Sequence, residues 1–445
     1  MNKLNYGRTF LVGLAFLSIS AFWQMYDGII PLMLKNTFGL TESVTGYIMA
    51  ADNVLAIFLL PAFGALSDKC RSRLGRRTPF ILIGTACAIT LLPTLPILDN
   101  SYASTPSTTT LVLFVCALAA LLISMGSYRS PAVALMPDVT PKPLRSKGNA
   151  VINLMGAAGG VIYLIITGIL YPQKAADGAH VNYLPLFIIV AVIMAAAVLV
   201  LFATIREPQL IAELDAYEKS HPEQNLMTVE DERGKQTLPL PVKKSLAFLL
   251  VSISLWFIGY NAVSTFFTTY ADEIWDMSAG QASLCLMVAT VGAIASYIPV
   301  GFIAAKIGRK KCILMGVAIL ASAFFAAYIC TLLFSEFTPL LFVLFVLVGF
   351  AWAAINVNSL PMVVEMCRGS DVGKFTGYYY TFSMAAQIIT PIIAGSLIDH
   401  VSYHTLFPYA AVFVAASFVT MLFVMHGDTV TEHKKSLLEN FDVDD

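Results

Sequence analysis

Charged residues are scarce in this sequence. Only 12% of its 445 residues are Asp, Glu, Lys or Arg, about half the share that is usual in soluble globular proteins. A soluble chain of this size needs a polar surface, so the shortage excludes a soluble multidomain enzyme and a disordered protein. The 27 basic and 28 acidic residues give a net charge of −1. The chain therefore has no basic excess with which to bind nucleic acid.

Motifs for catalysis, metal binding and nucleotide binding are also missing. The seven cysteines are scattered without a CxxC pair, which indicates small buried hydrophobes and not a zinc site or a disulfide framework. The six histidines fall in expected loops or tails, and neither HExxH nor GxSxG occurs. No GxxxxGK[ST] loop is present. We therefore expect no enzyme activity, no metal and no organic cofactor.

What the sequence has in abundance is long apolar runs. Hydrophobic residues make up 58% of the chain, and the mean hydropathy is +0.76. A bilayer core needs about 20 helical residues to cross it, whereas barrel strands are short and alternate in polarity. The pattern predicts an all-α membrane protein with twelve transmembrane helices, near 7–33, 43–66, 78–98, 109–136, 148–171, 182–205, 245–270, 279–303, 312–334, 338–364, 373–398 and 404–425.

A polar segment divides these spans six and six. Residues 206–244 have the composition of a solvated linker that has room for one short surface helix. We predict an N-terminal six-helix bundle at 1–205, a cytoplasmic linker at 206–244, a C-terminal bundle at 245–425 and a cytoplasmic tail at 426–445. With both termini in the cytoplasm, 24 of the 27 Lys and Arg residues lie inside and only Lys35 and Lys174 lie in outer loops. This asymmetry obeys the positive-inside rule.

Two loops at corresponding places in the two halves resemble each other. In the first loop, Gly64 and Asp68 precede the sequence R-L-G-R-R at 73–77. In the second loop, Gly301 precedes the similar sequence K-I-G-R-K at 306–310. A six-plus-six chain with a repeated loop indicates two repeated bundles. The G-x-x-x-D…G-R-R pattern resembles the signature loop of the major facilitator superfamily. The resemblance to this superfamily extends over the whole chain. That resemblance implies the major facilitator fold, transport by alternating access, and a cavity lined by helices 1, 4, 7 and 10.

Two longer segments are similar to particular branches of that superfamily. The segment SDKCRSRLGRRTPFILIG resembles the sucrose transporters and the glycoside-pentoside-hexuronide:cation symporters. The stretch Tyr128–Asp138 resembles the end of helix 4 in the sucrose transporters. The resemblance implies a sugar substrate, often a disaccharide. In melibiose permease, carboxylates on helices 2 and 4 bind sodium, but the corresponding positions here are Ala56, Leu60 and a place near Arg129. The acid in the middle of helix 4 of plant sucrose transporters falls near Leu122, so it is absent as well.

The basic loop is expected to act as a cytoplasmic gate. Asp68 closes a helix, and the arginines after it can pair with it and with helix-terminal carbonyls. Such a contact can hold the two halves together in one state and break in another. The alternative is that the basic residues only enforce topology. In the second loop the acid at the Asp68 position is missing, which predicts a weaker copy. The expected gate residues are Gly64, Asp68, Arg73, Gly75, Arg76, Arg77, Asp138 and Glu365.

Three charged residues lie within the apolar spans, namely Asp27, Asp52 and Arg129. Such charges are costly in a bilayer and are functional candidates. We expect Asp52 and Arg129 to face the cavity and interact, so that remodelling of the contact lets the carboxylate take a proton. Proton coupling is favoured because a built-in arginine opposes sodium, while facilitated diffusion and another cation remain open. Alternatively, Asp27 sits at the water interface, and Arg129 snorkels or pairs with Asp138.

Polar and aromatic side chains on otherwise apolar spans predict a cavity for a hydroxylated solute, because buried amides need partners. The alternative for each residue alone is helix packing. The expected substrate-binding residues are Trp23, Gln24, Tyr26, Asn53, Asn149, Asn153, Tyr260, Asn261, Trp352, Asn356, Tyr379 and Gln387.

Together these features predict a monomeric, multi-pass secondary transporter of a bacterial plasma membrane. Its expected activity is proton-coupled symport of a sugar or glycoside, with H⁺ as the coupling ion and no cofactor. The alternative within transport is a proton-coupled exporter of a drug or metabolite, because one fold supports both. A membrane sensor or a membrane enzyme would require a soluble domain or catalytic machinery that the sequence does not show.

Overall fold

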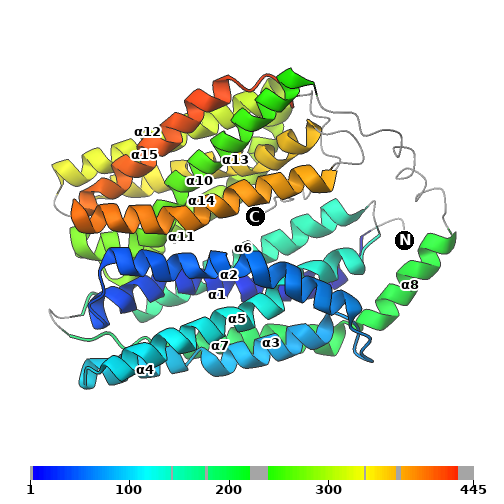
Figure 1. Ribbon diagram of the computed structural model, residues 1–445, viewed down its shortest axis with the longest axis horizontal. Helices are drawn as coiled ribbons and strands as arrows, with labels where there is room; N and C mark the ends of the chain where they lie inside the picture. The colour runs from blue at the N-terminus through cyan, green and yellow to red at the C-terminus, as the bar shows by residue number, and fades with distance from the viewer. Residues whose placement is uncertain are drawn as a thin grey trace. The chain divides into compact units, whose positions relative to one another are not determined.

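The computed structural model describes residues 4–141, 144–175, 179–220, 239–334, 337–366 and 372–428. Within these ranges the chain is helical apart from its connections and one isolated bridge between Ser72 and Gly75. Figure 1 shows the helices α1 (Tyr6–Leu32), α2 (Glu42–Lys69), α3 (Thr78–Leu91), α4 (Thr94–Ser104), α5 (Thr108–Asp138), α6 (Arg145–Leu170), α7 (Leu184–Thr204), α8 (Glu207–Ser220), α10 (Leu240–Trp275), α11 (Ala279–Ile307), α12 (Arg309–Leu333), α13 (Leu340–Glu365), α14 (Val372–His400) and α15 (Leu406–Leu422). Short helices follow α1 (η1, Met33–Thr37) and precede α15 (η4, Tyr403–Thr405).

The prediction of twelve membrane-spanning helices is confirmed. Twelve helices of the described chain are long and apolar enough to cross a bilayer. Large apolar side chains on them are exposed, such as Ile169 at 71% and Phe58 at 69%. Such surfaces would associate in water, whereas in a bilayer they face lipid. The cytoplasmic location of the termini stays a prediction.

The third span differs from its expected form because it consists of two helices. We predicted one helix near 78–98, but α3 ends at Leu91 and α4 begins at Thr94, with Pro93 between them. Proline has no amide hydrogen to donate and its ring crowds the preceding turn, so a continuous helix is unfavourable there. The two pieces together cover Thr78–Ser104.

The chain divides into two compact units. The first comprises Met1–Thr41, Ala51–Ser220 and Met277–Leu284, and the second Glu42–Ala50, His221–Asp276 and Cys285–Asp445. Helices α2 and α11 therefore each contribute residues to both units. The expected division at 1–205 and 245–425 did not include this sharing and stays a prediction.

The same helix pairings occur in each unit. In the first unit α1 packs against α6 and α7, while α3 packs against α5 and α7. In the second unit α10 packs against α14 and α15, while α12 packs against α13 and α15. These are corresponding spans of the two halves. The pairings agree with the internal repeat that the two matching loops indicated.

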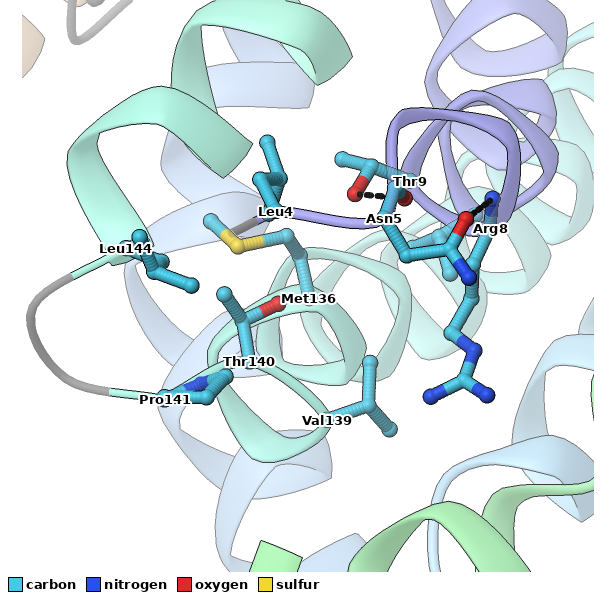
Figure 2. A pocket seen from close by; sticks show the side chains of 10 residues that line it. Leu4, Asn5, Arg8, Thr9, Met136, Val139, Thr140, Pro141 and Leu144 are labelled. Atoms are coloured by element: carbon cyan, nitrogen blue, oxygen red, sulfur yellow. Dashed lines mark hydrogen bonds between the residues drawn. The ribbon is translucent and has the colours of Figure 1, made fainter. Parts of the chain in front are cut away.

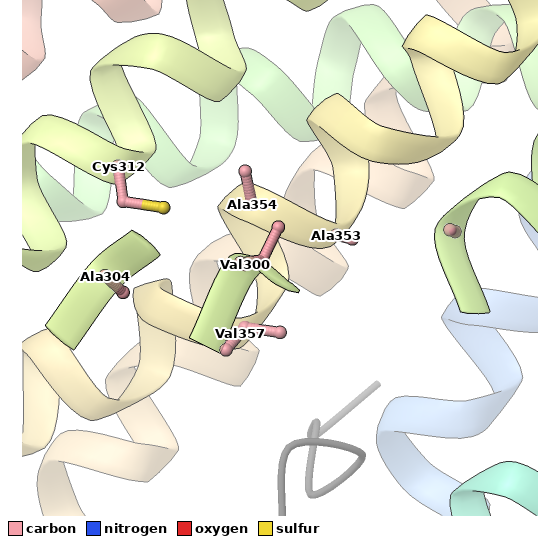
Figure 3. Packing of buried hydrophobic residues seen from close by; sticks show 7 residues of the cluster. Val300, Ala304, Cys312, Ala353, Ala354 and Val357 are labelled. Carbon is pink, nitrogen blue, oxygen red and sulfur yellow. The ribbon is translucent and has the colours of Figure 1, made fainter. Parts of the chain in front are cut away.

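Small residues allow the helices of each unit to approach closely. A Cβ atom at Gly159 of α6 would overlap the backbone of Leu17 in α1, and one at Gly349 of α13 would overlap the backbone of Ala289 in α11. Figure 3 shows a similar contact in the second unit, made by side chains of α11, α12 and α13: Val300, Ala304, Cys312, Ala353, Ala354 and Val357. Close packing of small side chains is a main source of helix association in membranes.

The cysteines are mostly, but not entirely, as expected. Cys285, Cys312 and Cys330 are buried and free, as small apolar residues often are. Cys87 and Cys116 are also free but are exposed on the surfaces of α3 and α5. Cys367 lies outside the described residues.

Candidate functional site

The first unit brings together the three charged residues found within the spans. Asp27 lies on α1, Asp52 on α2 and Arg129 on α5, and each is half-buried. The charge of Asp52 acts on Asp27, and the charge of Arg129 acts on Asp52. A neighbouring cation favours an ionised carboxylate, while a second carboxylate opposes it. The group therefore combines the two opposing influences that a proton-binding site uses.

Aromatic and amide side chains complete this group. The Arg129 guanidinium carbon lies 5.7 Å from the ring centre of Trp23, within the range of a cation–π interaction. The Asn53 amide donates a 2.9 Å hydrogen bond to Asp52 Oδ1. Arg129 thus has an aromatic neighbour as well as a carboxylate. Asp138, the other expected partner of Arg129, is bonded to Arg76 and Arg77.

Two buried donors near this group have no hydrogen-bond partner among the residues that the structure describes. The Trp23 indole nitrogen and the Tyr26 hydroxyl are both inaccessible to solvent and unsatisfied. The two rings are 5.4 Å apart in an edge-to-face arrangement. Buried donors of native proteins nearly always bond to protein, water or ligand. Trp23 and Tyr26 can therefore donate to a polar solute or to water.

The other predicted polar residues of the first unit lie on or face α6. Gln24 of α1 is half-buried, and its Oε1 would lie 3.6 Å from a Cβ added at Gly160 of α6. Asn149 and Asn153 are half-buried one turn apart on α6. All three residues therefore lie on two helices, α1 and α6, that pack closely against each other.

A second group of predicted residues forms an aromatic cluster in the second unit. The rings of Tyr260 on α10 and Trp352 on α13 are stacked 3.6 Å apart at an interplanar angle of 6°. Phe257 makes an edge-to-face contact with Trp352 at 5.4 Å and another with Tyr379 of α14 at 6.5 Å. A flat aromatic surface of this kind binds the C–H faces of sugars, and it also packs well against apolar ligands.

Unsatisfied amide atoms accompany the cluster. Asn261 follows Tyr260 on α10, and its Nδ2 has no hydrogen-bond partner within the described part of the chain. Asn356 lies one turn after Trp352 on α13, is 5% exposed and has an unsatisfied Oδ1. One is a donor and the other an acceptor, as a hydroxylated solute requires. Gln387 is half-buried two turns beyond Tyr379 on α14.

The expected gate residues form a hydrogen-bonded network at the α2–α3 loop. Arg77 pairs with Asp68 at the end of α2 and, at 2.8 Å, with Asp138 at the end of α5. Arg76 also pairs with Asp138, at 3.0 Å. Arg77 further donates to the Gly64 carbonyl at 3.3 Å. Burial lowers the pKa of Arg77, but its hydrogen bonds and ion pairs with Asp138 and Asp68 raise the pKa by more than burial lowers it. The arginine therefore stays charged.

Sequence reasoning missed the centre of this network, Glu207. We expected residues 206–244 to be a solvated linker, yet Glu207 is 0% exposed. Its carboxylate accepts from the backbone N–H groups of Arg76, Arg77 and Thr78, at 2.8–3.0 Å, and from the Thr78 hydroxyl at 2.8 Å. These amides begin α3, where no intrahelical acceptor exists. A negative charge at that place is stabilised by the helix dipole.

The remaining gate residues show why the loop has its sequence. Gly75 has φ of +112°, and a Cβ there would overlap the Glu207 side chain, so only glycine fits. Arg73 is exposed. The rest of the linker up to residue 220 forms α8, the short helix we expected, and Leu210 and Leu214 lie on its buried face. Residues 221–238 lie outside the described residues.

The second unit repeats the network with different acids. Arg309 pairs with Glu365 at the end of α13, which corresponds to Asp138 at the end of α5. Asp428, just after α15, accepts from the Lys310 amide at 3.1 Å, as Glu207 after α7 accepts from the amides of α3. Gly308 has φ of +92°, like Gly75. We missed Asp428 for the same reason as Glu207: neither belongs to the loop motif.

A separate pocket of about 240 Å³ lies at the beginning of α1. Asn5, Arg8 and Thr9 line it from α1 and its cap, opposite Met136 and Thr140 around the end of α5 (Figure 2). Arg8 also pairs with Glu213 of α8 at 3.3 Å. The pocket contains none of the predicted substrate-binding residues, so it is distinct from both groups described above.

Comparison with known proteins decides the family. The model of the Major Facilitator Superfamily matches residues 12–278 and 249–440. The chain belongs to the major facilitator superfamily. It is a multi-pass membrane transporter and not an enzyme, as the sequence predicted.

Relatives by sequence include proteins named as sugar transporters. The proton-associated sugar transporter A of Mus musculus is 31% identical over 144 residues, which cover 31% of this chain and 19% of that protein. The sucrose transport protein SUC3 of Arabidopsis thaliana is 28% identical over 138 residues, covering 28% and 23%. The matches thus cover less than a quarter of either relative.

Solved structures agree on the fold. The xylose transporter XylE from E. coli aligns with a TM-score of 0.66 at 15% identity, covering 98% of each chain. A bacterial homologue of the iron transporter ferroportin aligns with a TM-score of 0.68 at 12% identity, covering 94% of this chain and 99% of the other. Structures named as a sugar transporter and as an iron-transporter homologue align about equally well with this chain. The structural likeness therefore shows the fold but not the substrate.

Proposed function

We propose that this protein is a proton-coupled symporter of a sugar or glycoside. The observation that carries the proposal is the group of Asp27, Asp52 and Arg129 beside the unsatisfied donors of Trp23 and Tyr26. Ionisable groups inside a membrane protein are retained for function because they are costly. The sequence relatives, named as proton-associated sugar and sucrose transporters, support the same reading.

In this proposal Asp52 is the proton-binding group. The charge of Arg129 favours the ionised form of Asp52, and Asp27 lies within electrostatic range of Asp52. A movement of Arg129 toward the Trp23 ring, which already lies 5.7 Å from the guanidinium carbon, would remove the stabilising charge. Asp52 would then take a proton. Protonation thereby becomes linked to the arrangement of α1, α2 and α5.

The sugar would bind to the aromatic cluster of the second unit. The stacked pair of Tyr260 and Trp352 offers a flat apolar face, while Asn261 and Asn356 offer a free donor and a free acceptor. A sugar ring has the matching surfaces, with C–H groups on its faces and hydroxyls at its edges. A purely apolar drug would leave both amides unsatisfied, which costs about 1–3 kcal/mol each.

The networks around Arg77 and Arg309 would act as the cytoplasmic gate. Each joins a short loop to the end of a neighbouring helix and to an acid beyond the last span of its half. We further propose that the termini face the cytoplasm, since the basic loops then obey the positive-inside rule.

A ligand screen tests the sugar class. Purified protein is heated with a panel of mono- and disaccharides, and unfolding is followed by intrinsic fluorescence. A binding sugar should raise the unfolding temperature in a concentration-dependent way, because it binds only the folded state. If no sugar shifts the transition while a hydrophobic drug does, the exporter alternative replaces the proposal.

The aromatic cluster gives a sharper prediction. Trp352→Ala should raise the KM for the identified sugar about tenfold, the loss expected for one aromatic face worth roughly 1–1.5 kcal/mol. Trp352→Phe should retain part of the stacking, so its KM should lie between those of the unchanged protein and the alanine variant. Trp275→Phe is the control, because Trp275 packs at the far end of α10 against Phe267 and Tyr270. An unchanged KM in the alanine variant would remove Trp352 from the binding site.

A further inference from the structure

The pocket at the beginning of α1 lies wholly within the first unit and contains none of the predicted substrate-binding residues. Its volume of about 240 Å³ is somewhat below the ~300–1,000 Å³ that is usual for drug-sized ligands, so it suits a small molecule. Most of its lining is apolar: Leu4, Val12, Met136, Val139, Pro141 and Leu144. These side chains would cover the apolar body of a ligand.

The polar groups of the pocket are chiefly hydrogen-bond donors. Arg8 lies along the α1 side and carries the only charge among the described lining residues (Figure 2). The Asn5 Oδ1 atom already accepts from the Arg8 amide at 3.1 Å, which leaves the Nδ2 donor of Asn5. The Thr9 hydroxyl donates to the Asn5 carbonyl at 3.0 Å. A cation and an amide donor without a carboxylate favour an anionic ligand.

Thr140 indicates most directly that the pocket binds a polar group. The residue is 4% exposed, and its side chain lines the pocket (Figure 2). Its methyl carbon faces Gly148 of α6, where an added Cβ would lie 3.7 Å from Cγ2, so the hydroxyl lies on the pocket side. The Thr140 carbonyl accepts from Arg145 at 3.3 Å, but the hydroxyl makes no hydrogen bond to any residue that the structure describes. Buried hydroxyls of native proteins nearly always have a partner.

We propose that this pocket binds a small organic anion, a carboxylate or phosphate with an apolar body. The anionic group would bind Arg8 and the Thr140 hydroxyl. The apolar body would lie against Met136, Val139 and Leu144. Hydrogen bonds to a guanidinium are about twice as strong as neutral ones, and its planar donors match carboxylate and phosphate alike. A neutral sugar would use neither the charge nor the apolar surface, so this site differs in chemistry from the aromatic cluster of the second unit.

Glu213 of α8 competes with such an anion for Arg8. Its Oε2 lies 3.3 Å from Arg8 Nη1, and the two side chains are 53% and 28% exposed. An ion pair this exposed contributes little to stability, so an anion in the pocket can replace it. Helix α8 begins at Glu207, whose carboxylate accepts from the first amides of α3. A bound anion would therefore loosen one attachment of the helix that carries the centre of the Arg77 network.

Fluorine NMR of the full-length protein in phosphatidylcholine nanodiscs tests the site without a transported substrate. The probes are 4-fluorophenyl phosphate and 4-fluorobenzoate, with 4-fluorobenzyl alcohol as the uncharged match. The protein should broaden the lines of both anions but not of the alcohol. Arg8→Gln should weaken anion binding about tenfold, because charge-assisted bonds are lost. Thr140→Val, of nearly the same shape, should weaken it about fivefold, because one neutral bond is lost. Arg71→Gln makes the same change at an exposed loop arginine and should bind like the unchanged protein.

Two further measurements test the competition with Glu213. Glu213→Gln should bind the phosphate probe about two- to fivefold more tightly, because Arg8 is released from its exposed acid partner. Saturating probe should accelerate hydrogen exchange of the amides of 210–216 in α8 by a similar factor in the unchanged protein. It should leave exchange in Glu213→Gln as it was. Equal affinity with and without the Glu213 carboxylate would overturn the competition.

Adding phosphatidylglycerol to the nanodiscs separates the two sources of such an anion. If this lipid displaces the probe from the unchanged protein, the site takes a lipid phosphate; if the probe stays bound, the site takes a soluble anion. The proposal is overturned if neither anion is broadened, or if the alcohol is broadened as strongly as the anions. It is also overturned if Arg8→Gln and Thr140→Val both bind the anions as tightly as the unchanged protein, because the anion then binds elsewhere.

Discussion

Replacing Asp52 by asparagine should abolish uphill accumulation of the substrate while leaving exchange across the membrane partly intact. Asparagine retains the shape and the hydrogen bond with Asn53 but can neither release nor take up a proton. A proton crossing 100 mV releases about 2.3 kcal/mol, enough for roughly fiftyfold accumulation. The variant should lose this fiftyfold accumulation, so that the substrate only reaches equal concentrations on the two sides of the membrane. Uptake and counterflow of radiolabelled substrate in the same liposomes measure both quantities.

Asp99→Asn provides the matched control for this experiment. Asp99 is a carboxylate of the same unit and is 0% exposed, but it lies on α4 beside His180, at 3.4 Å, and belongs to neither group of predicted site residues. The same chemical change at Asp99 should preserve accumulation. If Asp52→Asn concentrates substrate as well as the unchanged protein does, Asp52 is not the coupling residue.

The second large effect is expected from Glu207→Ala. The variant leaves the three amides that begin α3 and the Thr78 hydroxyl without their buried acceptor. Loss of one partner from such a buried charged network costs about 3–5 kcal/mol. The unfolding temperature in detergent should fall by about 10 °C, since each kcal/mol corresponds to roughly 2–4 °C in domains of this size. Scanning fluorimetry gives the value.

Glu213→Ala tests whether the loss is specific to the network. Glu213 is on the same helix, α8, but its side chain is 53% exposed and pairs with Arg8 at 3.3 Å. Exposed ion pairs contribute about 0–1 kcal/mol, so this variant should unfold near the temperature of the unchanged protein. Equal losses in both variants would mean that Glu207 acts only by anchoring α8.

The spans and the repeat could be predicted because they depend on local composition. Apolar runs of sufficient length must be helical in a bilayer, and the matching loops around Gly75 and Gly308 reveal the duplication. The division of the third span at Pro93 also has a local cause. Hydropathy did not reveal it, because the apolar run continues across the proline. The sharing of α2 between units depends on contacts with α14, about 350 residues away, which hydropathy does not encode.

The site could be predicted only in part, for a similar reason. Asp52 and Arg129 attract attention because a charge stands out in an apolar span. Glu207 and Asp428 are acids among other polar residues, so nothing local distinguishes the buried from the solvated ones. Phe257 was also overlooked, since an aromatic residue in a span is ordinarily packing, yet it contacts both Trp352 and Tyr379.

The most direct test of proton-coupled sugar symport uses liposomes that contain the purified protein and a pH-sensitive dye. Mono- and disaccharides are added outside, without sodium, and the lumenal pH is followed. Symport predicts lumenal acidification with the transported sugar, absent in Asp52→Asn and present in Asp99→Asn. A sugar that enters without any change of lumenal pH, or a lumen that becomes more alkaline as substrate enters, would contradict the account.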